Sequence, residues 1–150
     1  MITRLQIVHC ARQWLHTPYV HQGRQKGKAA DCLFPLCVAE ELGVLDKYGV
    51  PLKASDYPEY SSQPKDGLIH EEAVKRLLRK DARELAPGDL VTTRFGGMAP
   101  SHCGIVAEFR GATYRTLTII HSDGSRVVEH SLTGAWRRRI MGAFSFPGVH

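Results

Sequence analysis

The sequence lacks both an apolar run long enough to span a membrane and an apolar N-terminal segment followed by small residues. A membrane-spanning helix needs about 20 mostly apolar residues, and a secretory signal needs an apolar core with a small-residue cleavage site. We therefore expect a chain without a membrane span that is synthesised in the cytoplasm without a signal peptide. Action in the cell wall, in the periplasm or on a virion then requires another route of delivery.

The sequence also lacks a Cys-x-x-Cys pair, although it contains four cysteines: Cys10, Cys32, Cys37 and Cys103. Their spacing does not match that of zinc ligands. A cytosolic chain of this length can build a core without disulfides. We expect no metal and no cofactor. Free cysteine is usually buried, so Cys10, Cys37 and Cys103 are expected in the core.

Nucleic-acid-binding motifs are absent despite a formal net charge of +5. Much of the excess positive charge lies in residues 24–28 and 137–139. A basic surface favours anionic partners, but no aromatic stacking pattern accompanies these residues. We expect a solvated basic face and no nucleic-acid partner.

Helical apolar spacing comes first along the chain, and strand patterns follow it. Helices are predicted over residues 2–15, 31–43 and 70–80, the last with Asp66 or His70 as its cap. Strands are predicted over residues 90–95, 101–109, 114–121, 126–130 and 136–146. Residues 20–30 are expected to form a loop, and residues 44–67 an irregular excursion. At 150 residues this order predicts one α+β domain over residues 1–150, with N-terminal helices packed on a C-terminal antiparallel sheet.

Cys32 differs from the other cysteines because of its place in the second helix. Asp31 is a good N-terminal cap, and Pro35 is tolerated only in a first turn, so the helix should begin close to Cys32. The dipole and unpaired amides of a helix start lower the pKa of a thiol. Cys32 is therefore the candidate nucleophile.

A cysteine nucleophile needs a histidine base, and that base needs a polar group to orient it. His102 begins a predicted strand and His121 ends the neighbouring one, so the two side chains can meet if the strands pair. Position alone also leaves six other histidines open: His9, His16, His21, His70, His130 and His150.

Five short motifs occur in the order typical of one family. They are Thr-Pro-Tyr at 17–19, Asp-Cys at 31–32, Pro-Gly-Asp-Leu at 87–90, His-Cys-Gly-Ile-Val at 102–106 and Ile-His at 120–121. Together they resemble NlpC-type cell-wall cysteine peptidases from about residue 5 to about residue 146. Residues 136–144 are similar to the ending of the phage-tail and gene-transfer-agent branch.

The resemblance implies a papain-like fold and hydrolysis of amide bonds in peptidoglycan stem peptides, typically between D-glutamate and a diamino acid. It implies Cys32 as nucleophile, His102 as base and His121 as the third residue. It also implies Tyr19 near the oxyanion and Asp31 near the free amine of the substrate. No cofactor is implied, and the partners are the stem peptide and, in this branch, phage tail-tip proteins.

One motif departs from the family pattern, because Leu33-Phe34 replaces the usual Ser-Gly after the cysteine. This leaves the exact bond open. Three alternatives also stay open: a papain-like amidase or acyltransferase acting on a lipid or protein, an inactive tail-tip assembly protein, and a zinc-binding module.

Overall fold

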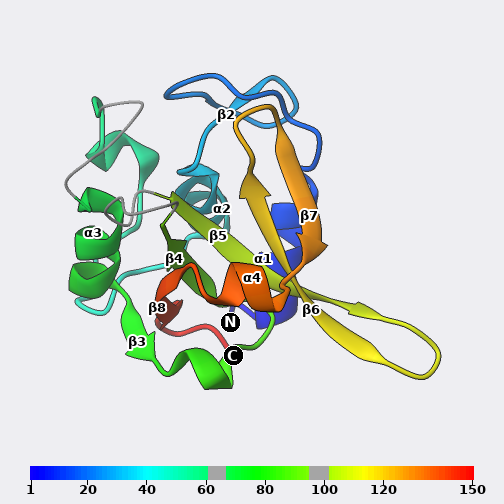
Figure 1. Ribbon diagram of the computed structural model, residues 1–150. Coiled ribbons are helices and arrows are strands. Elements are labelled where there is room, and N and C mark those ends of the chain that lie inside the picture. Colours follow the sequence, from blue (N-terminus) through cyan, green and yellow to red (C-terminus); the bar gives the residue numbers. More distant parts are fainter. Residues whose placement is uncertain (61–66, 95–101) are drawn as a thin grey trace.

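The computed structural model describes residues 1–60, 67–94 and 102–150 and has the predicted α+β fold (Figure 1). Its helices are α1 Arg4–Arg12, α2 Phe34–Leu42, α3 Leu68–Arg76 and α4 Gly134–Arg137, with short 3-10 turns at Ala54–Asp56 and Ala82–Glu84. None of the helices in these ranges is long and apolar enough to cross a membrane.

A six-stranded antiparallel sheet forms the centre of the molecule, with strand order β3-β8-β4-β5-β6-β7. Its strands are β3 Leu78–Lys80, β4 Leu90–Thr93, β5 His102–Arg110, β6 Arg115–Ser122, β7 Val127–Ser131 and β8 Ile140–Ser145. The strands expected over residues 114–121 and 126–130 pair as an antiparallel hairpin, in which Ser122 is opposite Val127. Residues 95 and 101, expected in strands, lie outside the described ranges.

Several boundaries differ from the sequence prediction, and tertiary pairing explains them. The helix expected over residues 70–80 ends at Arg76, because Leu77 is extended and residues 78–80 pair with β8 as β3. Its N-cap is Gly67 rather than His70, and Asp66 lies outside the described residues. The strand expected over 136–146 is α4 followed by β8, and the loop over 20–30 contains a small hairpin of β1 Arg24–Gln25 and β2 Ala29–Ala30.

The first helix is also shorter than the expected range of residues 2–15. Thr3 starts it with a capping box, in which its hydroxyl accepts from the backbone of Gln6 and the Gln6 side chain accepts from the Thr3 backbone. It ends at Arg12, and His16 then takes a left-handed φ of 70°. The turn is fixed by a bond from the His16 amide to the carbonyl of Val127, 2.9 Å away. The chain therefore leaves the helix before Pro18 could end it.

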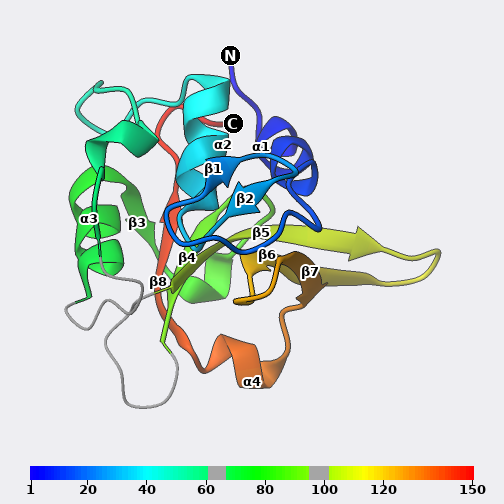
Figure 2. The ribbon, with the colours of Figure 1, turned by 90° about the horizontal axis from the view of Figure 1, so that it is seen from above.

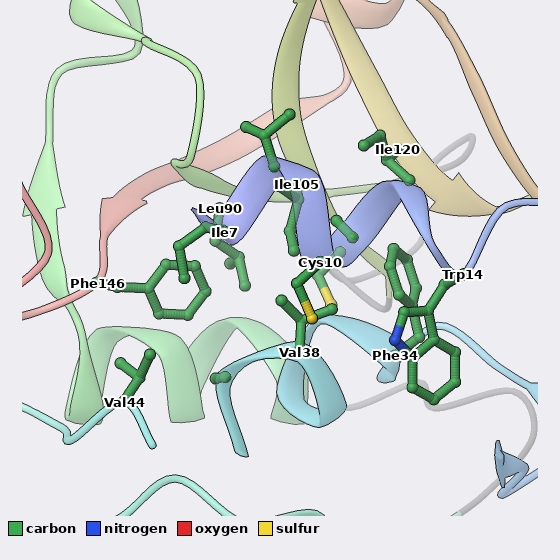
Figure 3. Packing of buried hydrophobic residues seen from close by; sticks show 14 of the residues in the cluster. Ile7, Cys10, Trp14, Phe34, Val38, Val44, Leu90, Ile105, Ile120 and Phe146 are labelled. Carbon is green, nitrogen blue, oxygen red and sulfur yellow. The ribbon is translucent and has the colours of Figure 1, made fainter. Parts of the chain in front are cut away.

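Helices α1 and α2 cover one face of the sheet, whereas α4 lies on the other (Figure 2). The main core lies under α1 and α2, where Phe34 and Val38 meet Ile105 and Ile120 of the sheet, all fully buried (Figure 3). A second cluster on the opposite face includes Val91, Val106, Ile119 and Leu132, with Trp136 packed against it. Cys10 and Cys103 are buried as predicted, and Cys37 is half-buried against the core.

The aromatic contact at the start of α2 should carry much of the stability. Phe34 is fully buried and its ring centroid lies 6.1 Å from that of Trp14. We expect Phe34→Ala to lower the free energy of unfolding by about 3–5 kcal/mol through lost burial and a cavity. Phe109→Ala is the matched control, because Phe109 is 54% exposed and should cost less than about 1 kcal/mol. Denaturant unfolding measures both, and equal effects would contradict this packing.

Candidate active site

Cys32 lies in the turn that leads into α2, not in the helix itself. The helix begins at Phe34 with Leu33 as its N-cap, so the expected helix start at Cys32 is wrong by two residues. Asp31 is consequently not the helix cap. Its Oδ1 accepts from the backbone N–H of Leu33 at 2.9 Å, which closes the turn around Cys32. Pro35 does lie in the first helical turn, as predicted.

The Asp31 carboxylate organises this turn from a buried position, with only 2% of the residue exposed. Oδ1 accepts from the Leu33 amide. Oδ2 accepts from the backbone N–H of Gln22 at 2.8 Å and from the hydroxyl of Tyr60. These donors come from three separate segments of the chain. The carboxylate therefore ties residues 22 and 60 to the head of α2. Tyr60 was not foreseen, because nothing in an irregular polar segment marks one tyrosine as a partner.

The same turn also contacts the start of β5. The Cys103 thiol donates to the backbone carbonyl of Cys32 at 3.0 Å. Since Cys103 directly follows His102, this contact fixes the turn that carries Cys32 beside the first residues of β5. Gly104, the next residue of β5, allows close packing on the opposite face of the sheet, where a side chain at this position would meet Ile119 at 2.9 Å.

The thiol of Cys32 has a raised pKa, contrary to the expectation of a lowered one. Burial, and next the negative charge of Asp31, raise its pKa to about 12, while a hydrogen bond from the Cys32 backbone acts in the opposite direction. Desolvation disfavours the thiolate, and here it outweighs the favourable amide. In the free protein, Cys32 is therefore a neutral thiol.

The structure brings His102 and His121 together, as the pairing of their strands predicted. His102 Nε2 lies 2.9 Å from His121 Nδ1, and the two rings are nearly perpendicular. His121 Nε2 lies in turn 2.7 Å from His130 Nε2. Trp136 packs against the rings of His121 and His130, with centroids 4.7 and 4.8 Å away.

Sequence reasoning left His130 open without placing it at the site. Alternation along β7 places His130 on the same face as Val128. In the observed register Val128 is opposite His121, and His130 is opposite Ile119. Opposed residues share a face of a sheet, as do residues two apart on one strand. His121 and His130 are therefore diagonal neighbours, but only the register shows this.

Both central imidazoles are held neutral. Burial, and next the charge that His121 can carry, lower the pKa of His102 to about 3. Burial, and next the charge of His130, lower the pKa of His121 to about 4. A neutral imidazole has one unprotonated nitrogen, which is the form required of a base. The Cys32 thiol and the imidazoles of His102 and His121 are therefore all uncharged.

Tyr19 is 36% exposed, and the pKa of its hydroxyl is raised because burial and then the charges of Asp31 and Cys32 disfavour the phenolate. Its backbone N–H bonds to the carbonyl of Ser125 at 2.8 Å, and Tyr19 forms a bridge with Ala30. The segment thus joins the turn of the β6–β7 hairpin to the residues before Asp31. Its phenol remains a protonated donor.

In the described ranges, no three His, Cys, Asp or Glu side chains are grouped so that they could hold a metal ion. No family model and no curated protein matches the chain. Among solved structures, it is similar to an N-acetylmuramoyl-L-alanine amidase from Bacteroides uniformis ATCC 8492. The identity is 12%, the match covers 94% of this chain and 96% of that chain, and the TM-score is 0.45. A likeness at this level says nothing about the chemistry of this chain.

The raised thiol pKa can be tested by alkylation. Because the pKa of Cys32 is about 12, the rate of its reaction with iodoacetamide should rise about tenfold per pH unit from pH 6 to 10 without a plateau. Tandem mass spectrometry separates Cys32 from Cys37. The urea-unfolded chain is the control and should level off above about pH 8.5. A folded-state midpoint below pH 8 would contradict the neutral thiol.

The neutral imidazoles should make stability depend on pH. An unfolded histidine takes up a proton below about pH 6.5, whereas His102 and His121 do so only near pH 3 and 4. The unfolded state then binds more protons, so the free energy of unfolding falls as the pH drops below 6.5. His102→Gln should reduce this slope by up to about 1.4 kcal/mol per pH unit. Exposed His9 provides the control, His9→Gln, and equal slopes for the wild type and His102→Gln would refute the assignment.

Proposed function

We propose that the chain is a cysteine amidase that hydrolyses amide bonds in peptidoglycan stem peptides, with the D-glutamyl–diamino acid bond as its target. Cys32 is the nucleophile, His102 the base and His121 the residue that orients it. The observation that carries the proposal is the paired imidazoles at the start of β5, where Cys103 also holds the Cys32 turn at 3.0 Å. The ordered motifs of the sequence supply the substrate class.

The first step is attack of the Cys32 sulfur on the scissile carbonyl carbon. As the S–C bond forms, the thiol proton moves to His102 and the carbonyl electron pair moves to oxygen. This transfer creates two opposite charges together, and their attraction offsets part of the desolvation that either charge would meet alone. The tetrahedral intermediate then collapses, the C–N bond breaks, and the departing amine takes the proton from His102.

Release of the product requires water. His102 takes a proton from the water molecule as it attacks the thioester, and collapse of the second intermediate breaks the C–S bond. The sulfur leaves with the proton held by His102, so the enzyme returns to its neutral state. No external reductant or oxidant enters this sequence.

Two groups are suited to the oxyanion. The backbone N–H of Cys32 and the phenol of Tyr19, a residue that is 36% exposed, are the proposed donors, because such donors stabilise developing negative charge. Asp31 is only 2% exposed and its oxygens are occupied by chain donors. It would therefore attract a substrate amine by its charge rather than by contact.

The place of action proposed for the chain is the cell wall, reached as part of a phage tail or a phage-derived device. The resemblance of residues 136–144 to that branch supports this, and tail-tip proteins are then its assembly partners. The same resemblance supports the non-enzymatic alternative of a tail-tip assembly protein, which a cysteine variant separates from the amidase.

A second candidate function is supported by an apolar cavity of about 90 Å³ between α2 and α3. Leu33, Leu36, Tyr60 and Cys103 are among the side chains that line it. Leu33 follows Cys32 in the sequence, and the Cys103 thiol donates to the Cys32 carbonyl. A cavity of this kind suits an aliphatic group. It therefore favours an amidase or acyltransferase whose substrate carries a short acyl chain.

The test compares purified peptidoglycan with short-chain N-acyl amides. We expect the wild type to release stem-peptide fragments, detected by mass spectrometry, and Cys32→Ala and His102→Gln to lose at least about 10³-fold in rate. Cys37→Ala, at a half-buried cysteine of α2, is the matched control and should keep activity. Cleavage of the acyl amides alone would select the second candidate. Wall degradation unaffected by Cys32→Ala would contradict both.

A further inference from the structure

The row of histidines continues beyond His121 and ends on a backbone carbonyl. His130 Nδ1 lies 3.0 Å from the carbonyl oxygen of Ser131, and His130 Nε2 lies 2.7 Å from His121 Nε2. His121 Nδ1 is in turn 2.9 Å from His102 Nε2. Three imidazoles and one carbonyl thus form an unbroken sequence of contacts at hydrogen-bond distance.

The carbonyl decides where every hydrogen in this sequence lies. A carbonyl oxygen only accepts, so His130 must carry its hydrogen on Nδ1, and in a neutral ring its Nε2 is then an acceptor. His121 must donate to it from Nε2, which leaves His121 Nδ1 as an acceptor. His102 must therefore donate from Nε2.

The consequence falls on the far nitrogen of His102. A neutral imidazole with its hydrogen on Nε2 is unprotonated at Nδ1. Burial keeps His102 and His121 in their neutral forms, as their lowered pKa values indicate. If any one of the three neutral rings carried its hydrogen on the other nitrogen, one of these contacts would be lost. Two hydrogens or two lone pairs would then face each other between neighbouring rings, or a lone pair of His130 would face the Ser131 carbonyl oxygen.

Packing keeps the three rings in this arrangement. The rings of His121 and His130 are nearly perpendicular, with centroids 4.9 Å apart, and Trp136 lies against both. The guanidinium of Arg139 lies 5.1 Å from the centre of the Trp136 ring. The indole therefore restricts rotation of both imidazoles about the sheet surface.

We propose that His130 is a positioning residue that, through His121, keeps the hydrogen of His102 on Nε2 and leaves Nδ1 as the base. The consequence for catalysis rests on the proposed function. Ser131 contributes through its backbone carbonyl, so its side chain is free to vary. The active residues then form a row of four, Cys32, His102, His121 and His130, instead of a triad.

The test combines a spectroscopic and a kinetic readout on the full chain. Two-bond ¹H–¹⁵N spectra of the imidazoles at pH 7 report which nitrogen carries each hydrogen. His130→Gln retains an acceptor near the position of Nε2, whereas His130→Leu has none. We expect the wild type and His130→Gln to show the hydrogens of His102 and His121 on Nε2. His130→Leu should show mixed tautomers at both.

In kinetics, His130→Leu should lower kcat for release of stem-peptide fragments at least about tenfold, because a wrongly placed proton removes the base. KM should change less than about twofold, and His130→Gln should stay within about threefold of the wild-type kcat. His9→Leu, a change of the same kind at an exposed position, should alter neither readout.

A wild-type spectrum with the His102 hydrogen on Nδ1 overturns the proposal without any variant. So does a folded His130→Leu protein with unchanged tautomers. If the tautomers follow the expected pattern while no amide substrate is cleaved, the proposed function fails and the positioning role of His130 is supported by the spectra alone.

Discussion

The candidate site depends on the hydrogen-bonded contact, or joint, between the turn before α2 and the start of β5. The buried Asp31 carboxylate closes that turn from within through the Leu33 amide, and the Cys103 thiol fixes its carbonyl to the sheet. The proposed nucleophile and base, Cys32 and His102, lie 70 residues apart in sequence. Without this joint, nothing local would bring them together. Asp31 is therefore the structural centre of the candidate site.

Burial is the second determinant, and it sets the chemistry of the resting protein. The same desolvation that raises the pKa of Cys32 lowers those of His102 and His121. The resting site therefore keeps its proton on sulfur, and in the proposed mechanism the proton leaves only as the substrate carbonyl is attacked. This differs from a cysteine site that rests as a thiolate–imidazolium pair, and it limits reaction of Cys32 with other electrophiles.

Much of this arrangement could be predicted from the sequence. Apolar spacing and strand alternation gave the α+β order, and the adjacency of β5 and β6 placed His102 beside His121. The resemblance supplied the chemistry. The start of α2 was predicted two residues early, because the Asp31 carboxylate accepts from the Leu33 amide in a turn before the helix, and in sequence this resembles a helix cap.

The features that could not be predicted depend on tertiary contacts. Residues 78–80 continue a helical pattern, but their pairing with β8 makes them a strand. The contact of His130 with His121 follows from the β6–β7 register, which composition does not encode. The pKa of the Cys32 thiol depends on how far the turn is buried, which a sequence motif does not show. A helix start favours a thiolate only while water still reaches the sulfur.

The central claim is that Cys32 and His102 form one reactive pair. A short bifunctional alkylating agent, 1,3-dichloroacetone, can join a thiol and an imidazole only when they lie within a few ångströms of each other. After treatment at alkaline pH, peptide mapping should find one bridged species that links Cys32 to His102 through Nδ1, and His102→Gln should abolish it. Bridging of Cys32 to another residue, or single alkylation alone, would contradict the account.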